Sequence, residues 1–284
     1  MSVASKVKER LSLRTAQVRA MVTLALSNVM SRRPAVAAGG PVVSLTSYGK
    51  RARTVGFTLE SIAQGTLLPS RLLLWLDEPE LIARLPASVR RLQARGLEVL
   101  PCENYGPHKK YYPYVAAQTT LDAPLVTADD DVLYPRDWLA SLIAAHQREP
   151  ELVHCYRARV MALSGSELLP YASWPDCSTT APSHRHFSVG LAGVLFPAHV
   201  QRELQHSGAS FTSSCPRTDD IWLNLHAQRA GARVRQLRAR PQHFMLLPGT
   251  QSVALLHSNV QTGNDAALRK LYDAEQLARL LQHA

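Results

Sequence analysis

The sequence predicts an α/β fold in which a mostly parallel β-sheet is flanked by helices. Two features of the chain point to this fold. Short apolar, β-branched runs alternate with segments whose apolar residues recur at helical spacing, and short polar loops join them. Strands and helices that alternate in this way form parallel sheets through right-handed crossovers. With 46% hydrophobic residues in a chain of 284, a substantial core can also form.

The first half of the chain carries four predicted strands, separated by helical segments. The strands are expected at residues 42–46, 71–76, 96–100 and 123–128, and the helices at 54–64, 88–94, 112–119 and 138–146. The alternation then becomes less regular, with strands expected at 151–160 and 187–196, a long loop or subdomain at 165–186, and helices at about 217–230 and 264–282. Because ligands collect beyond the carboxyl ends of parallel strands, the polar residues that follow the early strands are the first candidates for a site.

Residues 1–40 form a basic N-terminal extension with a helical pattern, and residues 41–284 form the main domain. Seven basic residues surround a short apolar run at 20–26: Lys6, Lys8, Arg10, Arg14, Arg19, Arg32 and Arg33. The run is too short to span a membrane, and no small-residue cleavage site follows it. Two interpretations stay open. The segment is either a basic amphipathic helix resting on anionic lipid, or an ordinary helix that packs on the domain or frays from it.

Charge and cysteine content restrict the partners and the compartment. The formal net charge of +10 indicates an anionic partner, which is nucleic acid, a phosphorylated small molecule or an acidic membrane surface. The cysteines are scattered, with no CxxC pair, at positions Cys102, Cys155, Cys177 and Cys215. This pattern predicts reduced thiols in a cytoplasmic protein.

Three consecutive aspartates follow the predicted fourth strand in the stretch LVTADDDVLYP, residues 125–135. In an extended segment alternate side chains share a side, so Asp129 and Asp131 are expected to face one cavity while Asp130 points away. Two carboxylates on one side suit Mg²⁺ or Mn²⁺, which keep water and take phosphate oxygens as further ligands. The alternative is structural, because clustered aspartates also mark turns and helix N-termini.

An ordered series of motifs resembles the nucleotide-sugar-dependent glycosyltransferases of the GT-A fold, in particular the bacterial surface-polysaccharide enzymes. The series is PVVSLTSYGKR, LLLWLDE, GPHKKYYP, VTADDDVLYPRDWL, GVLFP and TDDIWL, and it covers roughly residues 41–275. The resemblance implies a nucleotide-binding half at 41–134 and an acceptor-binding half at 135–284. It also implies a D-x-D motif at a strand end, formed by Asp129 and Asp131.

The resemblance assigns expected roles to individual residues. Asp129 and Asp131 are the expected metal ligands, with Asp129 also near the donor, and His257 is a candidate third ligand or a structural histidine. The residues expected to contact the nucleotide-sugar donor are Thr46, Ser47, Tyr48, Asp77, Lys109, Lys110, Asp129, Asp130 and Gly193. Lys109 and Lys110 would stabilise the leaving diphosphate, or else form a solvated basic turn.

The acidic pair Asp219 and Asp220 carries the expected chemistry. An inverting transferase needs one carboxylate to deprotonate the acceptor hydroxyl, and the pair matches that position, with Asp220 slightly ahead of Asp219. The structural alternative is an N-capped helix, in which acids are favoured by the helix dipole.

The resemblance therefore implies a metal-dependent, inverting glycosyltransferase with a UDP-sugar donor and a surface-polysaccharide or lipid-linked acceptor. The expected location is the cytoplasm, with a peripheral contact at the inner face of the membrane as one interpretation of the N-terminal segment. Two other classes stay open. A nucleotidyltransferase also uses metal-bound aspartates, but SLTSYGKRAR has only one glycine. A basic nucleic-acid-binding protein is disfavoured, because the arginines are spread out and no nucleic-acid motif accompanies them.

Overall fold

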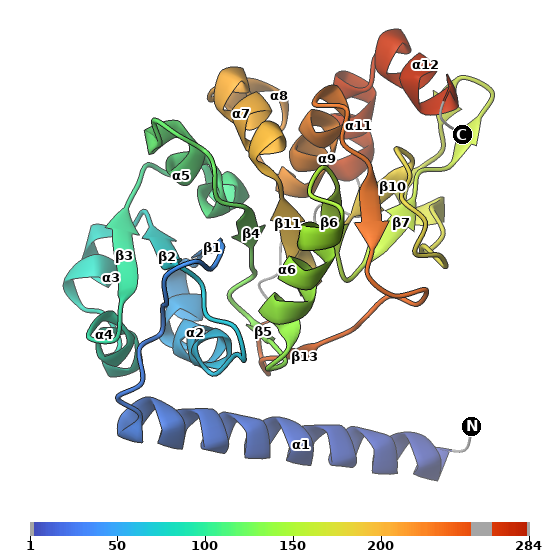
Figure 1. The fold of residues 1–284 in the computed structure, drawn as a ribbon. Coiled ribbons are helices and arrows are strands. Elements are labelled where there is room, and N and C mark those ends of the chain that lie inside the picture. Colours follow the sequence, from blue (N-terminus) through green and yellow to red (C-terminus); the bar gives the residue numbers. More distant parts are fainter. Residues whose placement is uncertain (1–2, 251–262, 283–284) are drawn as a thin grey trace.

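A computed structural model describes residues 3–250 and 263–282, and its centre is a seven-stranded sheet (Figure 1). The order across the sheet is β12-β6-β11-β4-β1-β2-β3. The strands are β1 (Val42–Thr46), β2 (Arg71–Leu76), β3 (Leu97–Pro101), β4 (Leu125–Thr127), β6 (Val153–Cys155), β11 (Val194–Phe196) and β12 (Val234–Gln236). Strand β1 pairs in parallel with β2 and β4, β2 with β3, and β6 with β12, whereas β11 is antiparallel to β4 and β6. The predicted α/β fold with a mostly parallel sheet is confirmed.

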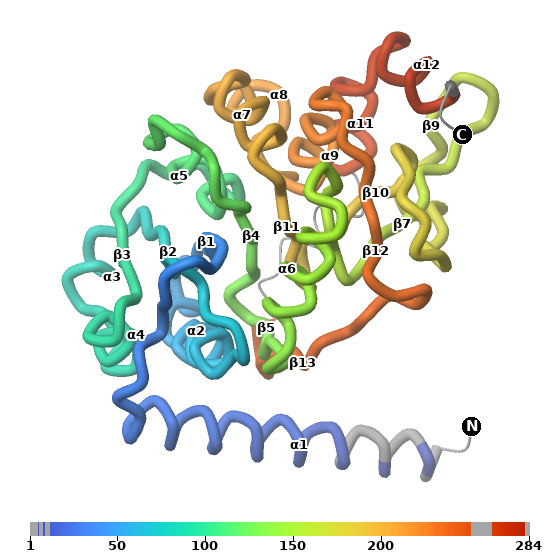
Figure 2. The backbone as a smooth tube through the Cα atoms, viewed as in Figure 1, coloured from blue at the N-terminus to red at the C-terminus, as the bar shows by residue number. Residues whose placement is uncertain are grey.

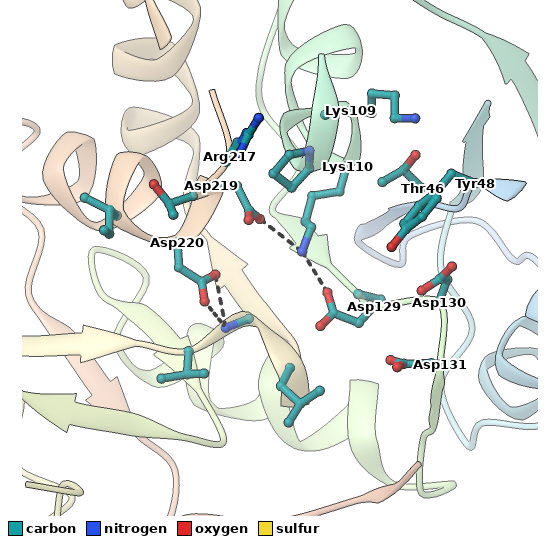
Figure 3. A pocket seen from close by; sticks show the side chains of 18 of the residues that line it. Thr46, Tyr48, Lys109, Lys110, Asp129, Asp130, Asp131, Arg217, Asp219 and Asp220 are labelled. Carbon is teal, nitrogen blue, oxygen red and sulfur yellow. Dashed lines mark hydrogen bonds and ion pairs between the residues drawn. The ribbon is translucent and has the colours of Figure 1, made fainter. Parts of the chain in front are cut away.

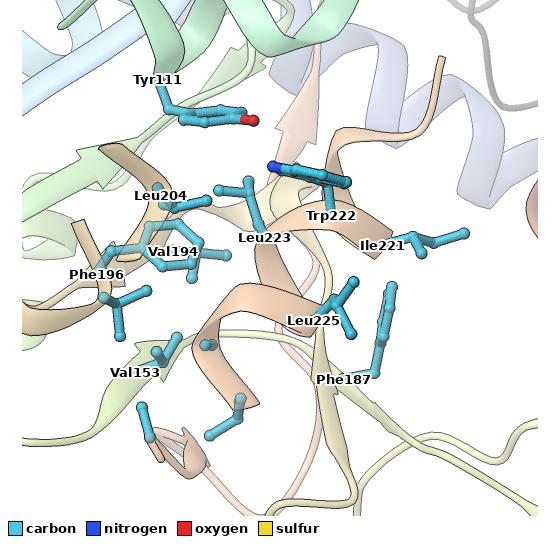
Figure 4. Packing of buried hydrophobic residues seen from close by; sticks show 14 of the residues in the cluster. Tyr111, Val153, Phe187, Val194, Phe196, Leu204, Ile221, Trp222, Leu223 and Leu225 are labelled. Atoms are coloured by element: carbon cyan, nitrogen blue, oxygen red, sulfur yellow. The ribbon is translucent and has the colours of Figure 1, made fainter. Parts of the chain in front are cut away.

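Helices cover both faces of the sheet because its central strands are apolar on both sides. In β2, Leu72 and Leu74 join one hydrophobic cluster, whereas Leu73 and Trp75 join the other. The first cluster is completed by α2 (Val55–Ala63), α4 (Ala87–Gln93) and α6 (Trp138–Arg148). The second is completed by α5 (Tyr112–Ala117), α7 (Ala198–Ser207) and α9 (Asp219–Arg229), and Figure 4 shows its packing between β11, α7 and α9.

Smaller elements extend this frame. Three short antiparallel pairs lie outside the main sheet: β5 (Val132–Leu133) with β13 (Met245–Leu246), β7 (Ala158–Val160) with β10 (His186–Ser188), and β8 (Leu163–Ser164) with β9 (Glu167–Leu168). Two short helices, α3 (Pro79–Ala83) and α8 (Phe211–Ser214), complete the connections.

Three predicted elements are each divided in two. The predicted strand at 151–160 becomes β6 and β7, and the one at 187–196 becomes β10 and β11. The second break contains Gly193, whose φ of +89° and close packing against the Trp138 ring leave no room for a Cβ atom. The predicted C-terminal helix becomes α11 (Asn264–Leu271) and α12 (Ala274–Gln282), and Asp273 caps the second by accepting the N–H of Gln276 at 2.9 Å.

The N-terminal segment is a long helix, α1 (Val3–Met30), which lies along one edge of the molecule and contacts α2 and α4 (Figure 1). Figure 2 follows its chain from the helix end into β1. Ser27 and Asn28 donate hydrogen bonds to the buried carboxylate of Glu60 in α2. Of the helices in the described part of the chain, none is both long and apolar enough to cross a membrane.

Candidate functional site

A pocket with a volume of about 540 Å³ opens at the carboxyl ends of β1, β2 and β4. Figure 3 shows the three aspartates that follow β4 on one side, Asp219 and Asp220 on the other, and Lys110 between them. Ten residues predicted from the sequence line this pocket: Thr46, Tyr48, Asp77, Lys109, Lys110, Asp129, Asp130, Asp131, Asp219 and Asp220. Chain segments nearly 180 residues apart thus meet at the edge of the sheet where a ligand is expected.

The three aspartates form a tight turn between β4 and β5, which we call the acidic turn (residues 129–131). Hydrogen bonds fix its backbone at Asp129 and Asp130. The N–H of Asp129 donates to the hydroxyl of Tyr134 at 2.9 Å, and the carbonyl of Asp130 accepts the Thr58 hydroxyl at 2.9 Å. A turn does not alternate its side chains as a strand does, and all three aspartates line the pocket. The carboxylate of Asp130 contacts Ser47 and Arg51, whereas that of Asp129 contacts Lys110, and the expected separation of Asp130 from its neighbours stays a prediction.

Arg51 binds two carboxylates of the acidic turn. It lies in η1 (Gly49–Arg53), the 3₁₀ helix that follows β1, and its guanidinium contacts Asp130 and lies 2.9 Å from Asp131. Ser47 donates its hydroxyl to Asp130 and is fully buried, so it supports the turn and does not line the pocket. Burial raises the pKa of Asp130 and of Asp131, and the charge of Arg51 offsets part of that rise.

Lys110 joins the two halves of the pocket. It is the last residue of η2 (Gly106–Lys110), and its Nζ lies 2.7 Å from Oδ1 of Asp129 and 3.0 Å from Oδ2 of Asp219. Burial alone would lower the pKa of Lys110, but the charges of Asp129, Asp219 and Asp220 raise it well above its usual value. The ammonium group of Lys110 therefore bridges the acidic turn and the start of α9.

Two further contacts fix the polar rim beyond β2. Lys109, also in η2, forms a buried ion pair with Asp77. The carboxylate of Glu78 accepts the N–H of Gly49 at 2.7 Å, which joins the end of β2 to the loop after β1. Lys109 and Lys110 are thus buried side chains that bind carboxylates, and the interpretation of a solvated basic turn is wrong.

Asp220 lies in the first turn of α9 and accepts a backbone hydrogen bond from the adjacent 3₁₀ helix η4 (Gly190–Ala192). The N–H of Gly190 lies 3.2 Å from each of its carboxylate oxygens. A Cβ atom on Gly190 would lie 2.7 Å from Oδ1 of Asp220, so the absence of a side chain there allows the close approach. Asn224, one turn later, donates to the carbonyl of Asp220 at 2.7 Å and anchors the helix start.

The surroundings of Asp220 raise its pKa to about 7. Burial contributes most, the neighbouring charge of Asp219 adds to the rise, and the charge of Lys110 opposes it. A carboxyl group whose pKa lies near neutral pH can accept and release a proton under physiological conditions. Asp219 and Asp220 are therefore not equivalent. Asp219 pairs with Lys110, whereas Asp220 has a pKa close to neutral pH.

Several residues line the pocket that the sequence did not single out. They are Arg51, Arg157, Tyr171, Phe187, Gly190 and Arg217. The basic string at 50–53 is a signal for Arg51, but Gly190 carries none, because only the folded chain brings it to Asp220. Among the predicted residues, Gly193 packs against Trp138 and does not line the pocket. His257 lies outside the described residues.

The carboxylates of the pocket also fit a divalent cation. Within residues 3–250 and 263–282, no three His, Cys, Asp or Glu side chains gather to hold a metal by themselves. Mg²⁺ and Mn²⁺ usually need only one or two carboxylates, with water and phosphate as the other ligands. The pocket lining contains seven Asp and Glu residues and five Lys and Arg residues, so carboxyl groups outnumber basic side chains around the candidate position of the ion. Asp129 and Asp131 are the candidate ligands.

Comparison with solved structures identifies the fold. A mannosyltransferase from Pyrobaculum calidifontis, in complex with GDP-Man and Mn²⁺, is similar over 95% of this chain and 79% of its own, with 14% identity and a TM-score of 0.53. The chain therefore has the GT-A-like fold of nucleotide-sugar glycosyltransferases, as its motifs imply.

Two other solved structures are less similar. A CMP:2-keto-3-deoxy-manno-octonic acid synthetase complexed with CTP matches over 68% of this chain and 86% of its own, with 13% identity and a TM-score of 0.40. A 4-diphosphocytidyl-2C-methyl-D-erythritol synthase matches over 80% and 98%, with 13% identity and a TM-score of 0.44. No protein-family description and no curated protein matches the sequence.

Proposed function

We propose that this chain is an inverting glycosyltransferase that moves a sugar from a nucleotide-sugar donor to an acceptor hydroxyl, with Asp220 as the general base. The position of Asp220 carries the proposal. It is a pocket carboxylate with a pKa raised to about 7, and it lies across the pocket from the acidic turn. General bases work best when their pKa lies near the pH at which they operate.

Asp220 would act at the acceptor oxygen. As that oxygen attacks the anomeric carbon of the donor sugar, its proton passes to the carboxylate of Asp220. The bond between the anomeric carbon and the diphosphate oxygen breaks at the same time, and the electron pair leaves with the nucleoside diphosphate. Attack and departure occur on opposite faces of the carbon, so the configuration inverts, and no covalent enzyme intermediate is needed.

Fixed positive charge would stabilise the departing diphosphate. Lys110 and Arg51 are already held in the pocket by its carboxylates, and Arg217 also lines it. Such preorganised charges stabilise a transition state without reorganising when charge develops. A divalent cation held by Asp129 and Asp131 would neutralise further charge on the diphosphate.

The opposite ends of the pocket suit the two substrates. Thr46, Tyr48 and Asp77 follow β1 and β2, where we place the nucleoside of a UDP-sugar. Tyr171, Phe187 and Ile221 line the side near Asp220 and give an apolar wall for the ring of an acceptor sugar. We propose that this acceptor belongs to a surface polysaccharide or a lipid-linked glycan, and that the reaction takes place on the cytoplasmic side.

A ligand panel tests the proposal. The melting temperature of the full chain is measured with UDP-, GDP- and CMP-sugars and with nucleoside triphosphates, each with and without Mn²⁺. A bound ligand stabilises the fold in proportion to the logarithm of its concentration over Kd. We expect a UDP-sugar to raise the melting temperature of the chain. We also expect slow hydrolysis of this donor, which releases UDP. Release of pyrophosphate from a triphosphate would instead identify a nucleotidyltransferase, and salt-sensitive binding of generic DNA alone would identify a nucleic-acid-binding protein.

A further inference from the structure

The helix α1 is held against the domain by polar contacts and by a small apolar cluster in which its Leu24 packs with Leu133 and Leu247. Glu60 is fully buried beneath it and accepts hydrogen bonds from Ser27 at 3.0 Å and Asn28 at 3.1 Å. Arg95 completes a buried ion pair with the same carboxylate at 2.7 Å. Nearer the N-terminal end of the helix, Gln17 donates to the carbonyl of Leu246 at 3.0 Å. These contacts fix the rotation of the helix about its axis, so its opposite face must point outward.

The outward face of α1 is apolar. Val18, Val22, Leu26 and Val29 recur at spacings of four, four and three residues, which places them on one side of the helix. Between 52% and 64% of each residue's surface is exposed, and the exposed fraction of Met30 reaches 77%. We call these five residues the apolar stripe. Leu13 is also exposed, but it lies on another side of the helix. The inward face also carries apolar residues, because Leu24 packs with Leu133 and Leu247, so α1 is apolar on an outward side that an ordinary surface helix keeps polar.

Positive charge surrounds the apolar stripe. Arg14 lies one turn before Val18, and Arg19 lies three residues before Val22, so both are beside the stripe, and both are exposed. Arg32 follows the end of the helix and is exposed as well. The first 33 residues contain seven Lys and Arg residues and one glutamate, a net charge of +6 out of the +10 of the whole chain.

We propose that the apolar stripe of α1 binds an anionic lipid surface, with the helix lying in the plane of the interface. An interfacial helix needs an apolar face that enters the boundary of the acyl chains and flanking cations that contact lipid phosphates, and α1 presents both. A second copy of this chain is a poor occupant, because pairing two stripes would bring two segments of charge +6 together. The inference goes beyond the proposed glycosyltransferase activity and does not depend on it.

Vesicle co-sedimentation of the full chain tests this surface. The vesicles contain either phosphatidylcholine alone or equal parts of phosphatidylcholine and phosphatidylglycerol. Wild type is expected to sediment with the anionic vesicles and to remain in solution with the neutral ones. A Val22→Ser, Leu26→Ser double variant should lose at least about tenfold in partition coefficient. An Arg14→Gln, Arg19→Gln double variant should lose roughly fivefold per charge, and added salt should weaken wild-type binding.

The matched control removes exposed apolar residues elsewhere. Leu169 and Leu281 are 38% and 43% exposed, and a Leu169→Ser, Leu281→Ser double variant should bind vesicles as wild type does. Circular dichroism and the melting temperature of each variant verify that it is folded. Equal binding by the stripe and control variants would overturn the proposal. An absence of wild-type binding to the anionic vesicles would overturn it as well. If the wild-type chain then self-associates, and the Val22→Ser, Leu26→Ser change abolishes this self-association, the occupant of the stripe is a second copy.

Discussion

The N–H of Gly190 lies 3.2 Å from both carboxylate oxygens of Asp220, and this contact leaves no space for a side chain on the glycine. A Cβ atom would lie 2.7 Å from Oδ1, closer than real Cβ contacts come. The glycine therefore acts as a positioning residue for the proposed base. The contact joins the turn before β11 to the start of α9, and the two residues lie 30 positions apart in the sequence.

Replacing Gly190 should damage turnover more than folding. In Gly190→Ala the carboxylate of Asp220 must rotate away from its present position, and we expect kcat to fall about 10²-fold, since a misplacement of about 1 Å costs that much. Donor affinity, measured by calorimetry, should stay within about twofold of wild type. As a control, Gly190→Ala in an Asp220→Asn background should cost almost nothing further, because residues that act together are not additive. Additive losses would show that Gly190 acts independently of Asp220.

The rate of transfer should rise with pH through about 7. Only the ionised carboxylate of Asp220 accepts a proton, and burial together with Asp219 places its pKa there. Lys110 lowers that pKa, so Lys110→Met should shift the acidic limb of the pH–kcat profile towards alkaline pH by about one unit, whatever its effect on the maximum rate. Asp219→Asn should shift the same limb towards acid. Two unshifted profiles would assign the titration to another group.

The same pKa has a consequence for stability. The pKa of Asp220 rises from a model-peptide value of 3.8 to about 7 in the folded chain, so between pH 4 and pH 7 the folded state binds more protons than the unfolded state. The contribution of Asp220 to the free energy of unfolding is therefore present at low pH and is lost as pH rises through about 7. We expect Asp220→Asn to melt above wild type at pH 8 and close to it at pH 4. An unchanged difference between the two proteins across this range would contradict the raised pKa.

The contact of Arg51 with the acidic turn gives a test of the metal site that needs no activity. Arg51→Gln leaves Asp130 and Asp131 without their ion-pair partner, and breaking such a buried pair costs about 3–5 kcal/mol. Mn²⁺ or Mg²⁺ should restore part of this loss and should raise the melting temperature of the variant more than that of wild type.

The exposed pair of Arg71 and Glu98 provides the matched control. These side chains are each 37% exposed, so Arg71→Gln should change stability by less than about 1 kcal/mol and should not respond to the metal. If Mn²⁺ and Mg²⁺ leave the melting temperature of Arg51→Gln unchanged, the acidic turn does not hold a cation.

Sequence patterns were sufficient to predict the central strands and the order of the early helices. The runs that form β1 and β2 are buried on both faces, as their content of apolar residues and their short length between polar loops indicate for strands inside a sheet. The breaks in later elements were not predicted, because they depend on contacts at long range. The break at Gly193, for example, is adjacent to the ring of Trp138, which lies 55 positions earlier.

The candidate site shows the same division. Carboxylates at strand ends and at a helix start could be located from local patterns, and Asp129 and Asp220 do line one pocket. Their separate environments could not be predicted, since the pairing of Lys110 with both Asp129 and Asp219 requires the folded chain. The contacts of each carboxylate in the acidic turn also require the folded chain, because strand periodicity does not extend through a turn.

A comparison of Asp220→Asn with Asp219→Asn tests the central claim most directly. Sugar transfer and donor binding are measured for both variants under the same conditions, with the donor that the ligand panel identifies. We predict that Asp220→Asn retains donor affinity and loses about 10²–10⁴-fold in kcat, whereas Asp219→Asn keeps measurable turnover. Turnover of Asp220→Asn at the wild-type rate, or the loss of activity in Asp219→Asn alone, would contradict the assignment of Asp220 as the base.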